Sequence, residues 1–182
     1  MFIIVVLLLI FSCKNYKEDK SIITLNEFNH KKNEDLKNNL IIYLEALQNA
    51  NTDKVIDYTY PDLFVWMQKK VPHNFNLDSI KGTLKTPILE AKKFNKENGI
   101  SFQFQISKIR KKVVFSNNII CLVIVSGIQK TDNEQATIND TIVAVSNNKG
   151  QSWKFMVKKN EMTKEILAIR FSEETINKLF EE

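Results

Sequence analysis

Few side chains in this sequence are suited to acid–base, nucleophilic or metal chemistry. The chain of 182 residues has two histidines, His30 and His73, and two cysteines, Cys13 and Cys121. His30 falls in a charged stretch and His73 in a loop beside a proline, so neither is expected on an inward-facing stripe where a general base would act. These residues are also too few for a zinc site or a disulfide framework. The sequence therefore points away from a histidine-dependent enzyme, and it implies no metal and no cofactor.

Asp140 is the acidic residue with the best case for a catalytic role. In the segment 136–146 it has the parity of Ile138 and Ile142, which would turn it toward the concave side of a sheet. A carboxyl group enclosed there would suit a general base. In the alternative interpretation the strand begins only at Thr141, and Asp140 belongs to a solvated loop.

A second candidate site is a pocket lined by aromatic side chains. Its members would come from the helical and the strand regions of the chain: Tyr58, Tyr60, Trp66, Phe102 and Phe104. Aromatic residues at helix and strand spacing also form ordinary hydrophobic cores, so a core role is the competing interpretation.

The charge distribution bears on possible partners. The chain has 26 Lys and Arg against 21 Asp and Glu, a net charge of +5, and no acidic residue between Glu97 and Asp132. The cluster at 108–112 suits anionic lipid headgroups or acidic polymers, or it is a solvated strand edge that discourages strand pairing. No nucleic-acid-binding motif accompanies it, so nucleic acid is not an expected partner.

Helical periodicity dominates the first half of the chain. With 43% hydrophobic and 26% charged residues, the chain is predicted to form one ordinary domain rather than a disordered or multi-span protein. Asn33 is expected to cap a helix with a stripe of leucines, Thr52 to cap a short second helix, and Pro61 to begin a third. A further helical region covers 78–97, with a division expected at Pro87.

Strand periodicity follows Gly99. Residues 100–107 alternate, a bulge is expected at 108–109, and further strands are predicted over 119–129, 136–146 and 151–159. Trp153 and Phe155 are expected at the centre of the core, and residues 172–180 to form a short helix. Short connections require antiparallel pairing, so we predict an α+β fold with N-terminal helices packed on one side of a curved four-stranded antiparallel sheet and a short C-terminal helix.

The N-terminus carries an apolar run followed by Ile10-Phe11-Ser12-Cys13. Residues 2–11 are too short to span a bilayer and suit the core of a signal peptide. The ending resembles a bacterial lipobox, which implies cleavage before Cys13 and lipidation of its sulfur. The expected organisation is a signal peptide at 1–12, a lipidated Cys13 with a flexible tether at 13–32, and a single domain at 33–182. The alternative is that residues 2–11 form a buried N-terminal strand or helix.

The order of elements resembles the nuclear transport factor 2-like, or cystatin-like, α+β fold. The closing segment VAVSNNKGQSWKFMV carries the resemblance, together with the Tyr60-Pro61-Asp62 step. This resemblance implies either of two functions. One is a non-catalytic binding or assembly module in the bacterial cell envelope, anchored to the bilayer through acylated Cys13, with a protein or small hydrophobic ligand as its partner. The other is a ketosteroid-isomerase-like enzyme acting on a small hydrophobic substrate.

Overall fold

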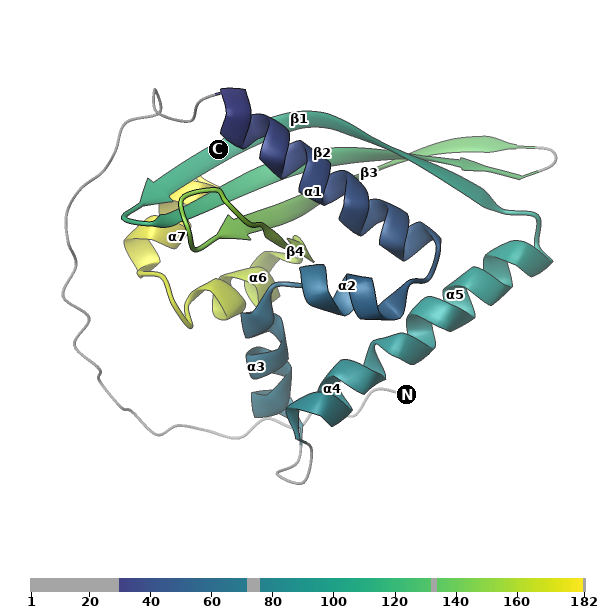
Figure 1. Ribbon diagram of the computed structural model, residues 1–182, viewed down its shortest axis with the longest axis horizontal. Coiled ribbons are helices and arrows are strands. Elements are labelled where there is room, and N and C mark those ends of the chain that lie inside the picture. Colours follow the sequence, from purple (N-terminus) through teal and green to yellow (C-terminus); the bar gives the residue numbers. More distant parts are fainter. Residues whose placement is uncertain (1–29, 72–75, 132–133, 182) are drawn as a thin grey trace.

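The computed structural model describes residues 30–71, 76–131 and 134–181, and the side chains from Lys32 onward. Within them, a group of helices precedes an antiparallel sheet, as predicted (Figure 1). The N-terminal helices are α1 (His30–Gln48), α2 (Thr52–Tyr58), α3 (Pro61–Lys70), α4 (Leu77–Thr83) and α5 (Lys85–Glu97). The sheet consists of β1 (Ser101–Phe115), β2 (Asn118–Lys130), β3 (Gln135–Ser146) and β4 (Lys154–Val157), and the chain continues with α6 (Asn160–Leu167) and α7 (Glu173–Phe180).

Three helix boundaries differ from the prediction. Helix α1 begins at His30, so Asn33 lies within its first turn instead of capping it, and the domain begins before residue 33. The cap of α2 is Asn51 rather than Thr52, because the Asn51 side chain accepts a hydrogen bond from the Lys54 amide at 3.2 Å. The helical region 78–97 divides at Leu84 rather than at Pro87. Pro87 lies in the first turn of α5, where its missing N–H group is not needed.

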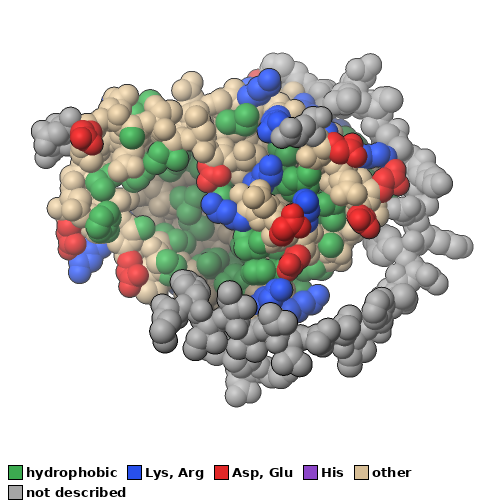
Figure 2. All heavy atoms as spheres, turned by 180° about the vertical axis from the view of Figure 1, so that it is seen from behind, with side chains coloured by type: hydrophobic (Ala, Val, Ile, Leu, Met, Phe, Trp, Pro, Cys, Tyr) green, Lys and Arg blue, Asp and Glu red, His purple; other side chains and the backbone are tan. Residues whose placement is uncertain are grey.

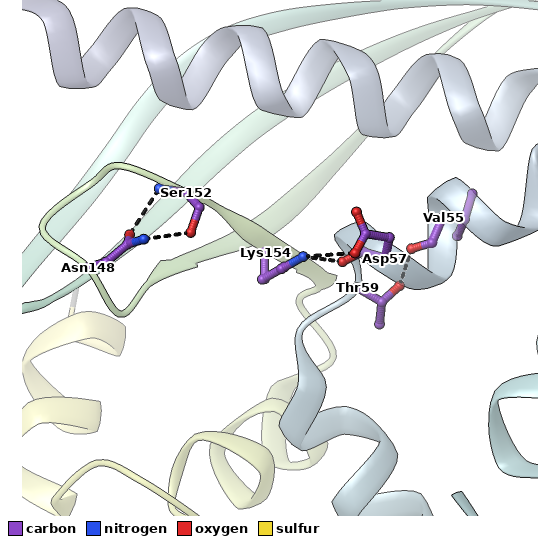
Figure 3. A network of polar contacts seen from close by, with 6 residues as sticks. All are labelled: Val55, Asp57, Thr59, Asn148, Ser152 and Lys154. Atoms are coloured by element: carbon purple, nitrogen blue, oxygen red, sulfur yellow. Dashed lines mark hydrogen bonds and ion pairs between the residues drawn. The ribbon is translucent and has the colours of Figure 1, made fainter. Parts of the chain in front are cut away.

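The sheet pairs consecutive strands in the order β1-β2-β3-β4, so β1 lies at one edge. The register between β1 and β2 shifts between Ile106 and Lys108, which confirms the predicted bulge. Between β3 and β4, the loop at Asn148 and Ser152 is closed by hydrogen bonds of 2.9 Å between their side chains and from the Ser152 amide to the Asn148 side chain (Figure 3). Gly150 has a φ of +87°, which explains the predicted glycine at this turn.

The sheet has a hydrophobic core on each face, and this corrects the expectation of helices on one side. On one face, α1 and α2 cover alternate residues of β2 and β3, with Trp153 and Phe155 fully buried among them. On the other face, α3, α6 and α7 cover the intervening residues, such as Leu122 and Val143. Both parities are therefore buried over Ile119–Val123 of β2 and Ile142–Ser146 of β3, as expected where strands are covered on two sides, whereas β3 is exposed from Gln135 to Asp140. The burial of Trp153 and Phe155 is confirmed.

The short strand β4 connects the sheet to the N-terminal helices. The Tyr60 amide donates to the Phe155 carbonyl at 2.9 Å, and Thr59 forms a parallel bridge with Phe155. The Lys154 ammonium group donates to the backbone carbonyl of Asp57 and lies 3.4 Å from its carboxylate (Figure 3). These contacts fix the end of α2 against the sheet.

The C-terminal helices were only partly predicted. Ser172 caps α7 by accepting from the Thr175 amide at 3.3 Å, as the sequence indicated. Helix α6 was not predicted; it begins at Asn160 without a side-chain cap, and Asn160, with a φ of +30°, makes the turn from β4. Its buried residues Thr163, Ile166 and Leu167 complete the second core.

Candidate functional site

The structure separates the aromatic residues that were predicted to share a pocket. Tyr58 is half-buried on the α1 face, where its ring stacks on Phe155 with 6.2 Å between the centroids. Tyr60 is buried in the core of the opposite face, and Trp66 packs against that core. These three are core or core-flanking residues. Phe102 and Phe104 lie on the edge strand β1, and Phe104 packs against the same core as Tyr58. Tyr58 and Tyr60 can enter different cores because the chain between α2 and α3 crosses the outer edge of β4, where Thr59 pairs with Phe155.

Asp140 lies on β3 opposite Val125, so it belongs to a strand rather than to a loop. Its side chain is exposed and accepts a hydrogen bond of 2.8 Å from the Thr141 amide. It does not line either of the cavities described below. The structure therefore does not bring Asp140 together with the predicted aromatic residues.

The other groups singled out from the sequence are distributed as follows. Cys13, His73 and the side chain of His30 lie outside the described residues. Cys121 is completely buried, and burial raises the pKa of its thiol to about 12. Burial in the same region lowers the pKa of the Lys112 ammonium group, which donates to the Asn33 side chain at 2.9 Å. A thiol of this kind is protonated at neutral pH and behaves as a small hydrophobic group.

A cavity of about 620 Å³ lies where the C-terminal end of α1, helix α5 and the beginning of β1 meet. Its floor and walls combine apolar side chains with a few polar ones, and Phe102 and Phe104 are among them. The remaining lining residues are Leu47, Gln48, Asn49, Pro87, Ile88, Ala91, Lys92, Asn95, Lys96, Ile100 and Ser101. This volume lies in the range of small-molecule and cofactor sites.

A second cavity of about 450 Å³ continues along the edge of β1, between that strand and α1. It shares Gln48, Phe102 and Phe104 with the first cavity, so we treat the two as one groove and call it the α1–β1 groove. Its further lining residues are Lys37, Ile41, Leu44, Glu45, Gln103, Gln105 and Ile106. Seen from behind, the molecule has a hollow with hydrophobic side chains in and around it (Figure 2).

Helix α5 forms the outer wall of the groove without packing closely on the body of the protein. None of its residues is buried, although Ile88 contacts the first core. Leu89 and Phe94, to either side of the groove-facing stripe, are 53% and 58% exposed. A helix of this length gains most of its stability from packing, so α5 receives little support from the body of the protein.

The charges along the groove are predominantly positive. Lys92 and Lys96 line the first cavity, where no acidic residue is present among the lining residues. The Lys92 ammonium group donates to the Asn49 carbonyl at 2.8 Å, which ties α5 to the end of α1. Lys37 and Glu45 line the second cavity. Among the described residues, then, the groove brings together no pair of Asp, His or Tyr side chains for acid–base chemistry.

The part of the groove formed by α5 was missed in the sequence. The signal was the spacing of Ile88, Ala91 and Asn95, which places these side chains on one helical face. Because that face is mixed in polarity, the pattern resembles an ordinary half-exposed helix. Only the position of α5 across from β1 gives it a role in a cavity.

Two further features of the described residues are relevant. No cluster of three or more His, Cys, Asp or Glu side chains there is arranged to hold a metal ion. No helix in the same part of the chain is both long enough and apolar enough to cross a bilayer.

Comparisons with protein-family models, with curated proteins and with solved structures give no match for this chain. The resemblance to the nuclear transport factor 2-like fold and to the lipobox stays a prediction. The interpretation of the groove accordingly rests on its geometry and chemistry.

Proposed function

We propose that this protein is a non-catalytic binding module that holds an apolar ligand in the α1–β1 groove. The observation that carries the proposal is the 620 Å³ cavity between β1 and a helix, α5, that has no buried residue. The α5 side of this cavity is mixed in polarity, and a large, mainly apolar cavity with a few polar groups beside a helix that packs loosely favours ligand binding. The ligand would add the contacts that α5 lacks.

The polar groups of the groove indicate how the ligand is oriented. Lys92 and Lys96 stand along one wall, opposite the aromatic rings of Phe102 and Phe104. These two rings stack with centroids 6.2 Å apart and make a continuous apolar surface. A ligand with an apolar body and a negatively charged group would satisfy both sides of the groove.

Binding of the anionic apolar dye 8-anilinonaphthalene-1-sulfonate tests this proposal. Ala91→Trp would place an indole in the first cavity, and we expect it to weaken dye binding at least ~10-fold. Ala168→Trp is the matched control, because Ala168 is exposed and lies beyond α6, away from the groove. Equal dye binding by the wild type and both variants would contradict the proposal, as would an absence of dye binding to the folded wild type.

We further propose that the module is held at a bacterial membrane through acylated Cys13. The support is the sequence Ile10-Phe11-Ser12-Cys13 after the apolar run of residues 2–11. Two or three acyl chains anchor a protein stably, whereas one does not. A clickable fatty acid fed to expressing cells should label the wild type and not Cys13→Ala. Equal labelling of both proteins would refute the anchor and leave the groove proposal unaffected.

A further inference from the structure

The outer edge of β1 lies open along the α1–β1 groove. In the described part of the chain, β1 pairs with β2 on one side and no strand pairs with its other side. The second cavity is lined by consecutive residues of β1 from Phe102 to Ile106. Since consecutive side chains of a strand point to opposite faces, a cavity that touches all of them lies at the strand's edge rather than over one face.

One hydrogen bond establishes which backbone groups of β1 point outward. The Gln48 side-chain amide donates to the Phe102 carbonyl at 2.8 Å. In an antiparallel pair, residues alternate between those bonded to the neighbouring strand and those whose N–H and C=O groups point away from it. Phe104 and Ile106 have the parity of Phe102, and the register is regular until the shift after Ile106. The outward-pointing groups of these three residues therefore form a short strand edge beside the groove, and a strand added there would displace the Gln48 side chain from the Phe102 carbonyl.

The charges on β1 distinguish this part of the edge from the rest. Residues 101–107, Ser-Phe-Gln-Phe-Gln-Ile-Ser, carry no charge, whereas Lys and Arg recur from Lys108 to Lys112. Lysines on an edge strand discourage pairing with another chain. The charges that discourage pairing with another strand are thus absent where β1 lines the groove, and they are present from Lys108 onward, where β1 does not line it.

We propose that the α1–β1 groove binds an extended peptide segment of a partner protein, which adds as a strand to β1 at residues 102–106. This inference rests on the proposed binding function and specifies its ligand class. Apolar side chains at every second position of the segment would enter the groove toward Phe104 and Ile41, and its backbone would pair with β1. This is the recognition mode known as strand addition.

Charge complementarity selects the partner. The first cavity has Lys92 and Lys96, and the second has Lys37 and Glu45, so the groove as a whole has three lysines to one glutamate. Neither β1 nor β2 contains an acidic residue. A segment with acidic residues beside its apolar positions is favoured. A second copy of this chain has the same net charge of +5, so long-range repulsion opposes it as the occupant.

The test uses peptides selected from a displayed random 12-residue library on the full-length protein. We expect enriched sequences with apolar residues at alternate positions and with Asp or Glu among the others. The best peptide is then synthesised with a fluorescent label in two N-methylated forms, each carrying methyl groups on one of the two alternating sets of amides. One form should bind at least ~10-fold more weakly than the other, because only one set of amides pairs with β1. Equal affinities would overturn strand addition, as would a failure to enrich any such sequence.

A pair of protein variants tests the β1 side of the same contact. Phe104→Pro and Phe104→Val both remove the aromatic ring, but only proline removes the outward N–H group. Proline is tolerated where the missing N–H faces away from the sheet. Peptide binding should be at least ~10-fold weaker in Phe104→Pro than in Phe104→Val, and circular dichroism checks that both remain folded. Equal loss in two folded variants would contradict the proposal, and if Phe104→Pro does not fold, the N-methylated peptides decide.

The outcomes separate this inference from the groove proposal on which it rests. If dye binding is lost in Ala91→Trp but peptide methylation has no effect, the groove binds apolar ligands without strand pairing. If the protein elutes as a dimer that Phe104→Pro dissociates, a second copy occupies the edge and the partner-peptide proposal falls. If Ala91→Trp leaves dye binding unchanged, the groove proposal fails on its own terms.

Discussion

Replacing Arg170 by methionine should destabilise the fold by about 2–4 kcal/mol. The Asp62 carboxylate is 1% exposed, and it accepts hydrogen bonds from Arg170 Nε at 2.5 Å and Nη2 at 2.9 Å. It also accepts from the Tyr60 hydroxyl at 2.8 Å. This cluster joins the start of α3 to the turn between α6 and α7. Removing one partner of a buried pair costs about 3–5 kcal/mol, and we lower that value because the Arg170 side chain is 52% exposed.

Urea unfolding followed by tryptophan fluorescence measures the effect. Arg110→Met is the control, because Arg110 is exposed on β1, and its loss should change the free energy of unfolding by no more than ~0.5 kcal/mol. Asp62→Asn and the double variant complete a thermodynamic cycle. The sum of the losses of unfolding free energy in the two single variants should exceed the loss in the double variant by at least ~1 kcal/mol. Additive effects, or a loss below ~0.5 kcal/mol for Arg170→Met, would refute the assignment of this pair as a connection between the two ends of the domain.

Three further predictions concern single buried side chains. Trp153→Ala should cost about 3–5 kcal/mol because the side chain is 1% exposed, and a thermal midpoint within a degree of the wild type would contradict its core position. In a Cys13→Ser background, Cys121 should react with a thiol reagent at least ~100-fold more slowly in the native protein than in urea; comparable rates would mean that the thiol is accessible. Burial raises the pKa of Tyr43 to about 12, above its ordinary 10.0. Between pH 10 and 12 the Tyr43 hydroxyl therefore ionises in the unfolded chain but not in the folded one. The free energy of unfolding should fall over that range, and it should fall less steeply in Tyr43→Phe. Identical pH profiles for the two proteins would argue against this tyrosine as a contributor.

The sequence by itself determined the local structure where a period or a cap was strong. The alternation after Gly99 predicted β1 and its bulge, and the leucine stripe predicted α1. The Ser172 cap predicted α7. These features depend on residues close together in the chain, so a pattern over one or two turns carries them. The α+β class follows from their order and from the short connections between strands.

Only the tertiary structure decided which face each element covers. Helices α6 and α7 fill the face that the sequence left open, because a continuous apolar strand such as β2 can be buried on one side or on both. For the same reason the sequence did not show that Tyr58 and Tyr60 belong to different cores. A turn of the backbone between them places one in each core. Local periodicity contains no information about such long-range choices.

The groove itself is also a tertiary feature. Its walls come from α1, α5 and β1, and the pattern of each wall alone is that of an ordinary half-buried element. Phe102 and Phe104 were identified from the sequence, because aromatic side chains alternate on β1 there. Gln48 and Ala91 were not, because a polar or small residue on a helix acquires a role only when another element stops short of covering it. The space between α1, α5 and β1 is set by how the whole chain packs its larger apolar faces, which no local pattern contains.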